Sequence, residues 1–120
     1  MTRRGGIYEV DWSPGRGSEQ TGVRPALVIQ NDTGNEFSPT TVVAAISSRA
    51  RRPYPFHVMI EARESGLPQD SIVKCEQIQT IAQSRLGRRV GKLGAEKMRE
   101  VDRALVNSLG IELPGSDLHC

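Results

Sequence analysis

An arginine between a glycine-rich segment and an apolar run is the residue of this chain that best suits chemistry on an anion. Arg24 follows residues 17–23, and Pro25 biases Arg24 toward an extended conformation and opens the apolar run 26–29, which predicts a buried strand. A guanidinium at a strand rim suits a phosphate or a carboxylate, because its planar fork holds two oxygens. An ion pair with Glu19 or Asp32 is the alternative, and this segment alone favours neither.

Other residue types that carry proton transfer or bind metals are scarce. His57 falls in a predicted strand, where a satisfied surface or edge position is the favoured interpretation, and His119 lies in the C-terminal tail. The sequence has no Walker-type phosphate loop, no Ser/His/Asp set and no metal-ligand spacing. The two cysteines, Cys75 and Cys120, indicate free thiols rather than a disulfide framework or zinc cluster. We therefore expect neither a metal nor a cofactor.

Length and composition predict one globular domain. The chain has 120 residues, 37% hydrophobic and 25% charged, and its apolar runs are too short to cross a bilayer. The expected domain covers residues 1–112, and a disordered tail covers 113–120. The basic N-terminus reaches Glu9 and Asp11 where a signal peptide needs its apolar region, so a cytoplasmic location is expected.

Positive charge is informative only locally in this chain. The net charge of +2 is too small to indicate nucleic-acid binding. A cluster of arginines follows one predicted strand and can join Arg16 and Arg24; its members are Arg49, Arg51 and Arg52. A solvated loop is the usual explanation of such a run.

Period-2 alternation predicts a fold made mostly of strands. Strands are expected over residues 8–12, 26–30, 40–47 and 56–60, with extended segments over 71–75 and 76–81. The strands at 40–47 and 56–60 are expected to form an antiparallel hairpin. Residues 32–35 and 65–68 predict turns, 13–23 an exposed loop and 83–86 a short helical turn.

One amphipathic helix ends the domain. Over residues 95–109, Met98, Val101, Leu105 and Leu109 recur at helical spacing, and Gly110 is a stop signal. Strands at short spacing followed by a single helix predict a mainly β fold with a C-terminal α-helix, in the α+β class, built as a compact antiparallel domain.

Three long, ordered motifs give the chain a family resemblance. They are Arg4-Gly5-Gly6-Ile7-Tyr8-Glu9-Val10-Asp11-Trp12, Gly17-Ser18-Glu19-Gln20-Thr21-Gly22-Val23-Arg24-Pro25-Ala26-Leu27-Val28-Ile29-Gln30-Asn31-Asp32 and Glu76-Gln77-Ile78-Gln79-Thr80-Ile81. In this order they resemble the MazF/PemK (Kid) family, the toxins of bacterial type II toxin–antitoxin modules. The resemblance implies a small SH3-like antiparallel barrel of the MazF/PemK/CcdB type. It also implies a sequence-specific, metal-independent endoribonuclease, an mRNA interferase that cleaves single-stranded RNA and inhibits translation and growth.

The resemblance also assigns roles to residues. It pairs Arg24 with a hydroxyl at the end of the strand that begins at Thr40, which is Ser47 here; family members commonly carry threonine there, and Ser47 can also simply end its strand. Gln77 is expected to hydrogen-bond the substrate or, alternatively, neighbouring backbone. An arginine holds its proton at neutral pH, so we assign Arg24 to stabilising the phosphorane and to proton donation. The general base stays open between Glu19 and water.

Two loops are expected to line the RNA groove. Residues 13–23 carry Ser18, Glu19 and Gln20, which either close over RNA or merely solvate the loop, and residues 49–55 carry the three arginines. The family also implies a symmetric homodimer and a MazE-like antitoxin whose disordered tail covers the RNA site. The alternative function is a non-catalytic toxin of the same architecture that poisons DNA gyrase by binding.

Overall fold

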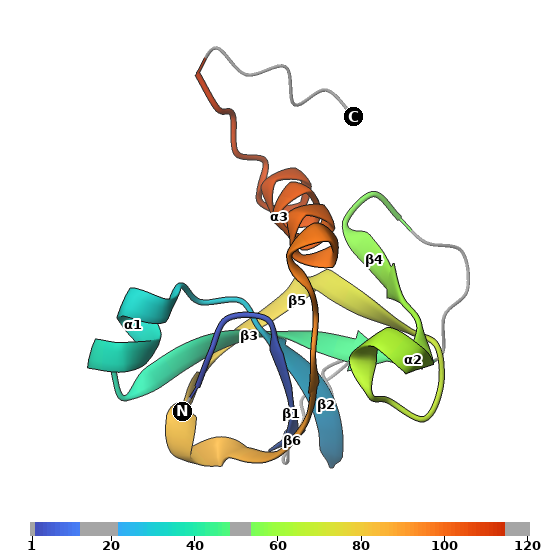
Figure 1. The fold of residues 1–120 in the computed structure, drawn as a ribbon. Coiled ribbons are helices and arrows are strands. Elements are labelled where there is room, and N and C mark those ends of the chain that lie inside the picture. Colours follow the sequence, from blue (N-terminus) through green and yellow to red (C-terminus); the bar gives the residue numbers. More distant parts are fainter. Residues whose placement is uncertain (1, 13–21, 49–53, 115–120) are drawn as a thin grey trace.

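The computed structural model describes residues 2–12, 22–48 and 54–114. Six strands form one curled, fully antiparallel sheet in the order β4-β5-β3-β2-β1-β6 (Figure 1). The strands are β1 (Gly6–Asp11), β2 (Val23–Val28), β3 (Thr40–Ser47), β4 (His57–Ile60), β5 (Ser71–Ala82) and β6 (Leu86–Lys92). The predicted loop residues Ser18, Glu19 and Gln20, the arginines Arg49, Arg51 and Arg52, and the tail beyond residue 114 lie outside the described residues.

Three α-helices and one 3-10 turn accompany the sheet. They are α1 (Asp32–Phe37), α2 (Ala62–Ser65), η1 (Gln83–Arg85) and α3 (Ala95–Leu109). The strand predicted at 40–47 and the helix predicted at 95–109 are confirmed to the residue, and Gly110 ends α3 in the left-handed region at φ 67°. None of the described helices is long and apolar enough to cross a membrane.

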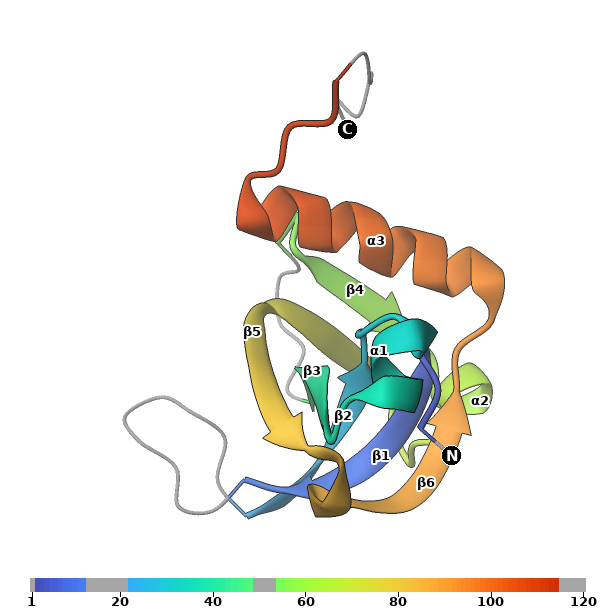
Figure 2. The same ribbon diagram turned by 90° about the vertical axis from the view of Figure 1, so that its left-hand side faces the viewer.

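Alternation along the strands gives the sheet two apolar faces. On β3, Ala44 and Ile46 point into one cluster, and Val43 and Ala45 point into the other. Helix α3 lies across β4 and β5 and covers the first cluster with Met98, Val101 and Ala104 (Figure 2). The second cluster is closed by the curl of the sheet and includes Tyr8, Val10 and Trp12 of the N-terminal segment. The fold is therefore mainly β with one long C-terminal helix.

The predicted hairpin of the third and fourth strands is wrong. β5 lies between β3 and β4 and pairs with both, so Ser47 lies opposite Ile72, and Ile72 lies opposite Met59. β3 and β4 are therefore not neighbours in the sheet and form no hairpin. The real hairpin joins β4 to β5 through α2, where Gly66 takes the left-handed conformation at φ 80°.

The turn predicted at 32–35 is the start of a short helix. Asn31 caps α1 by accepting the Gly34 amide at 2.8 Å. Asn35 is 5% exposed, and its side chain donates to the Gln30 carbonyl and accepts from Thr41 Oγ1 at 2.6 Å. Residues typical of turns thus form a helix because tertiary hydrogen bonds satisfy their side chains.

Two further elements differ from the sequence-based expectation. β6 was not predicted; it is an edge strand whose glycines and arginines lack a clear alternation. The two extended segments 71–75 and 76–81 are one strand, β5, whose pairing with β3 shifts between Ala44 and Ala45. The short helical turn predicted at 83–86 is present as η1.

Candidate functional site

Arg24 and Ser47 lie two residues beyond the last paired residues of β2 and β3. Ala26 lies opposite Ala45 and Val28 opposite Val43, and two more residues of the same register bring Arg24 level with Ser47. Both then project on the face of the second apolar cluster, beyond its last small residues. The pair predicted to carry the chemistry therefore lies at one end of the sheet.

The backbone around Arg24 is firmly held. Arg24 lies opposite Val10 on β1, and its carbonyl accepts a hydrogen bond from Trp12 Nε1 at 3.3 Å. The Trp12 amide donates to the Gly22 carbonyl at 2.8 Å, and Gly22 adopts φ 73°, a left-handed conformation that suits glycine. Arg24 itself is exposed, so the indole anchors its main chain and leaves the guanidinium at the solvent rim.

A lysine that the sequence did not single out joins this face. Lys74 on β5 lies opposite Ala45, while Ile72 lies opposite Ser47. Lys74 is thus the diagonal neighbour of Ser47, with its side chain on the same face. Lys74 is half-buried, and no ion pair involves it within residues 2–12, 22–48 and 54–114. Only the strand pairing identifies this second cation, because Lys74 is unremarkable in its own strand.

Gln77 lies at the margin of the region that holds Arg24, Ser47 and Lys74. Residues 75–77 of β5 fall between the pairs Ala44–Ile78 and Ala45–Lys74 and have no partner on β3. Gln77 is half-buried there, further along the sheet than Ser47. The structure therefore brings Arg24, Ser47 and Lys74 together and leaves Gln77 beside them.

His57 sits on an edge strand with its ring satisfied, as expected, but it faces the same side as Ser47. It lies opposite Lys74, and its Nε2 is 3.0 and 3.1 Å from the two carboxylate oxygens of Glu76. The Tyr54 amide donates to His57 Nδ1 at 3.4 Å, which leaves the hydrogen of the neutral ring on Nε2, facing the carboxylate. The His57 side chain is 8% exposed. This imidazole–carboxylate pair is not evident from the sequence, because Glu76 and His57 are far apart in the chain.

Cys75 is confirmed as a free, buried thiol. Burial, together with the neighbouring charge of Glu76, raises the pKa of the Cys75 thiol to about 12. The thiol therefore stays protonated at neutral pH and packs as an apolar side chain in the first cluster, so it is no nucleophile.

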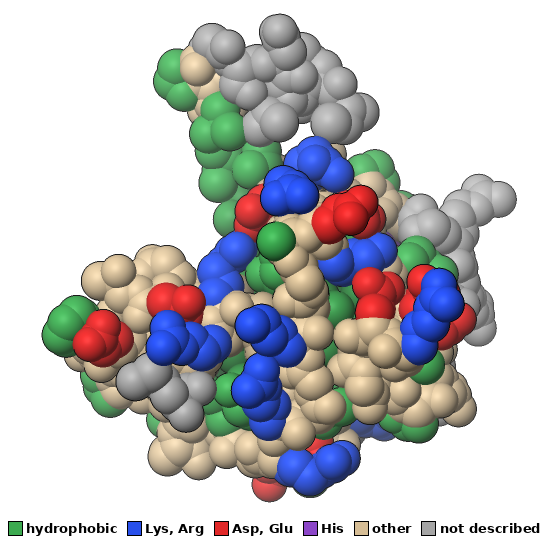
Figure 3. Space-filling view, viewed as in Figure 1, with side chains coloured by type: hydrophobic (Ala, Val, Ile, Leu, Met, Phe, Trp, Pro, Cys, Tyr) green, Lys and Arg blue, Asp and Glu red, His purple; other side chains and the backbone are tan. Residues whose placement is uncertain are grey.

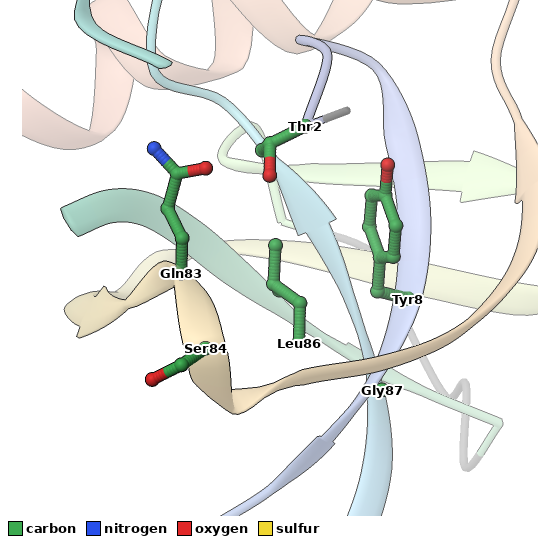
Figure 4. A pocket seen from close by; sticks show the side chains of 6 residues that line it. All are labelled: Thr2, Tyr8, Gln83, Ser84, Leu86 and Gly87. Atoms are coloured by element: carbon green, nitrogen blue, oxygen red, sulfur yellow. The ribbon is translucent and has the colours of Figure 1, made fainter. Parts of the chain in front are cut away.

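One hollow on the described surface lies away from these residues. It has a volume of about 540 Å3 and is lined by Thr2, Tyr8, Gln83, Ser84, Leu86 and Gly87 (Figure 4). η1 follows Ala82, which pairs with Thr40 at the opposite end of β3 from Ser47. The hollow therefore contains none of the predicted site residues.

Charge on the face with α3 is mixed. Basic and acidic side chains both lie there, with a row of basic ones down the centre of the view (Figure 3), and several are paired, including Arg4 with Asp102 at 2.5 Å and Lys97 with Glu100 at 3.2 Å. The charge pattern of this face does not identify an anion site, and the candidate for one is the strand end with Arg24, Ser47 and Lys74. Two cations beside a hydroxyl can bind a phosphate and stabilise charge that develops on its oxygens.

The fold defines the class of protein: a small curled β domain with a C-terminal helix, which carries Arg24, Ser47 and Lys74 at one end of its sheet. The model of the PemK-like, MazF-like toxins of type II toxin–antitoxin systems matches residues 3–109. The chain belongs to this family.

Solved structures agree with this assignment. MazF from Deinococcus radiodurans superposes with a TM-score of 0.77 at 26% identity, over 92% of this chain and 97% of that one. The Mycobacterium tuberculosis toxin MazF-mt6 gives a TM-score of 0.77 at 25% identity, over 90% and 99%. A mycobacterial endoribonuclease in complex with its cognate antitoxin gives 0.79 at 24% identity, over 95% and 100%, which at this identity supports the fold alone.

Proposed function

We propose that this toxin is a sequence-specific endoribonuclease that cleaves single-stranded RNA in the cytoplasm and thereby inhibits translation and growth. The observation that carries the proposal is the convergence of Arg24, Ser47 and Lys74 on one face at the end of the β2–β3–β5 sheet. A mycobacterial endoribonuclease and the Deinococcus MazF share the fold.

The chemistry follows from the side chains. The 2′-oxygen of the substrate attacks the adjacent phosphorus, a base takes its proton, the bond from phosphorus to the 5′-oxygen breaks, and that oxygen receives a proton. Arg24 stabilises the phosphorane and donates the proton, while Ser47 hydrogen-bonds a phosphoryl oxygen. Lys74 adds a second positive charge. Glu76 joins Glu19 and water as candidates for the base, because its carboxylate lies on this side of the sheet, fixed by His57.

Substrate contacts extend this site along the RNA. Gln77 hydrogen-bonds a nucleotide next to the cleaved bond. Ser18, Glu19 and Gln20 before Arg24, and Arg49, Arg51 and Arg52 after Ser47, line the path of the strand; these contacts rest on sequence position.

The deciding experiment is RNA cleavage in excess EDTA. Purified toxin is incubated with a long RNA, and the new ends are sequenced, which tests activity and sequence preference together. Arg24→Ala and Lys74→Gln serve as matched variants on either side of Ser47. Cleavage at a recurring short sequence, lost in Arg24→Ala and weakened in Lys74→Gln, supports the proposal. Intact RNA together with inhibition of gyrase supercoiling would support the alternative, a binding toxin on the same fold.

We further propose that the toxin acts as a homodimer and that a MazE-like antitoxin blocks it. The domain then spans residues 1–112. The antitoxin proposal is supported by related structures described as an endoribonuclease with its cognate antitoxin and as MazE–MazF from Deinococcus radiodurans. An exposed cationic site that must admit RNA is a natural target for an acidic, disordered segment.

A further inference from the structure

An aromatic cluster lies at the start of β4, and its most exposed member, Tyr54, takes no part in the proposed chemistry. The Tyr54 and Phe56 rings stack with centroids 5.3 Å apart and an interplanar angle of 7°. The His57 ring stands nearly perpendicular to both, at 5.4 Å from Tyr54 and 5.0 Å from Phe56. Phe56 packs on the first apolar cluster, but Tyr54 is 56% exposed. A large aromatic side chain is therefore held at the surface without burying its own ring.

The outer face of the Tyr54 ring is uncovered by its two aromatic neighbours. Phe56 is stacked on one face of the ring. His57 is almost equidistant from the two stacked centroids, so it lies beside the stack and not over the opposite face of Tyr54. The flat surface directed away from Phe56 is thus covered by neither of these two rings, and Tyr54 as a whole is 56% exposed.

The cluster is rigid before any ligand arrives. The His57 amide donates to the Tyr54 carbonyl at 2.9 Å, which closes a four-residue turn, and Pro55 occupies the second position, which favours such a turn. The Tyr54 amide donates to the His57 ring, and that ring is held by Glu76 on β5. Ordering a ligand on Tyr54 therefore costs little conformational entropy of the protein.

The His57 side of the cluster borders the candidate RNA site, whereas Phe56 packs on the apolar cluster of the opposite face. His57 lies opposite Lys74, which is the diagonal neighbour of Ser47. With about 4.8 Å between neighbouring strands, β4 lies about 14 Å across the sheet from β2 and Arg24. A strand of RNA whose phosphate lies at Arg24 can therefore reach Tyr54 with a base other than those flanking the cleaved bond.

We propose that the outer face of Tyr54 is a stacking platform for an unpaired base of the RNA, beside the bond that is cleaved. An aromatic face backed by a second ring and next to cations is what binds single-stranded nucleic acid, because every base presents a π-face. Tyr54 then adds affinity for RNA and fixes the register of the RNA strand in the site. The inference rests on the proposed function, since it takes RNA as the ligand.

The test uses variants that separate an aromatic face from apolar bulk. Tyr54→Leu keeps apolar contact with Phe56 but has no π-face, whereas Tyr54→Phe and Tyr54→Trp keep the face. Phe37→Ala is the matched control, because Phe37 is 78% exposed on α1 at the far end of β3. Thermal unfolding of each variant reports whether the fold is preserved.

The probe is a short RNA that spans a mapped cleavage site, carries 2′-deoxyribose at the cleaved nucleotide and holds 2-aminopurine at one position at a time. If the wild-type protein produces no cuts, a random-sequence single-stranded RNA is used instead. We expect stacking to quench the fluorescence at one position. In Tyr54→Leu that quenching is lost and Kd rises about 5- to 150-fold, while Tyr54→Phe, Tyr54→Trp and Phe37→Ala bind as the wild type does.

The outcomes separate this inference from the proposed function. Cleavage by the wild type, with unchanged Kd and quenching in Tyr54→Leu, overturns the platform and leaves the nuclease intact. Binding without cleavage, with the expected Tyr54 pattern, overturns the nuclease and supports the platform. Absence of both cleavage and binding overturns both. Loss of antitoxin affinity in Tyr54→Leu with unchanged RNA affinity assigns the ring to the protein partner and also overturns the platform.

Discussion

At the scale of single residues, the proposed catalytic role of the Arg24 side chain can be tested separately from the part that its backbone plays in the fold. Its carbonyl is used by Trp12, but its side chain is exposed at the end of β2. We expect Arg24→Ala to lower RNA cleavage by about a hundred- to a thousand-fold, the usual effect of removing one donor to a transition-state oxyanion. Arg24→Lys recovers little, because lysine keeps the charge but loses the planar fork.

The measurement is single-turnover cleavage of a defined RNA, with the unfolding temperature as the control for folding. Cleavage by Arg24→Ala within a few-fold of the wild-type rate would remove Arg24 from the mechanism.

Ser47 makes a complementary prediction, because only its hydroxyl is needed. We expect Ser47→Thr to keep or raise the cleavage rate, since the added methyl restricts the rotamer on β3, and Ser47→Ala to lower the rate strongly. The same single-turnover assay compares the two variants. If Ser47→Ala cleaves at the rate of the wild type, the residue merely ends its strand.

At the scale of elements, α1 is tied to the N-terminus by one carboxylate. Hydrogen bonds from the Arg4 amide at 2.7 Å and from the Asn35 side chain at 3.2 Å lower the pKa of Asp32 below its usual 3.8, and the charges of Arg3 and Arg4 act in the same direction. Because the folded-state pKa is lowered, the ionised carboxylate stabilises the native state fully above about pH 4, and this contribution is lost as the pH falls further.

The isosteric change Asp32→Asn tests this coupling. Its oxygen can still accept both hydrogen bonds, so only the charge is removed. We expect a small decrease in the unfolding temperature at pH 7 that shrinks as the pH is lowered from 4 toward 2. Asp32 is exposed, so solvent screening keeps the effect modest. A difference that stays constant over this range would show that the charge is irrelevant and that the substitution disturbs packing.

At the scale of the whole molecule, the proposed function assigns one cationic surface to both RNA and antitoxin. An acidic, disordered segment that covers Arg24 and Lys74 prevents RNA from binding, so we expect inhibition by antitoxin to be competitive with RNA. The measurement is a titration of antitoxin against toxin loaded with a fluorescent, uncleavable RNA. A ternary complex that persists at saturating antitoxin would show that the two ligands use different surfaces.

The parts of the fold that sequence predicts well are those with strong local periodicity. β3 and α3 are apolar at period 2 and at helical spacing, and tertiary contacts only reinforce these patterns. The order of strands is different, because nothing in residues 40–60 reveals that β5 inserts between β3 and β4. α1 was missed for a related reason: Gly34 and Asn35 favour a turn until Gln30 and Thr41 satisfy the Asn35 side chain.

The residues of the candidate site also divide into those that the sequence indicates and those that only the strand pairing reveals. Arg24 and Gln77 came from motifs and Ser47 from the family resemblance, and the register of β2 and β3, continued by two residues, brings Arg24 level with Ser47. Lys74, His57 and Glu76 could not be found in this way, because their common face depends on two strand pairings and on the shift in β5. The local sequence of a strand does not show which distant strand it pairs with.

The insertion of β5 between β3 and β4 also determines when, during synthesis, the strands that carry the candidate site can pair. As the chain leaves the ribosome, residues 1–60 already contain Arg24, Ser47 and Tyr54, but β3 and β4 have no direct pairing to make with each other. They must wait for residues 71–82, and such long-range closure is slow compared with a local hairpin. Under the proposed function, we therefore expect translation products that stop before β5 to lack activity, so that the antitoxin is needed only once most of the chain has been synthesised.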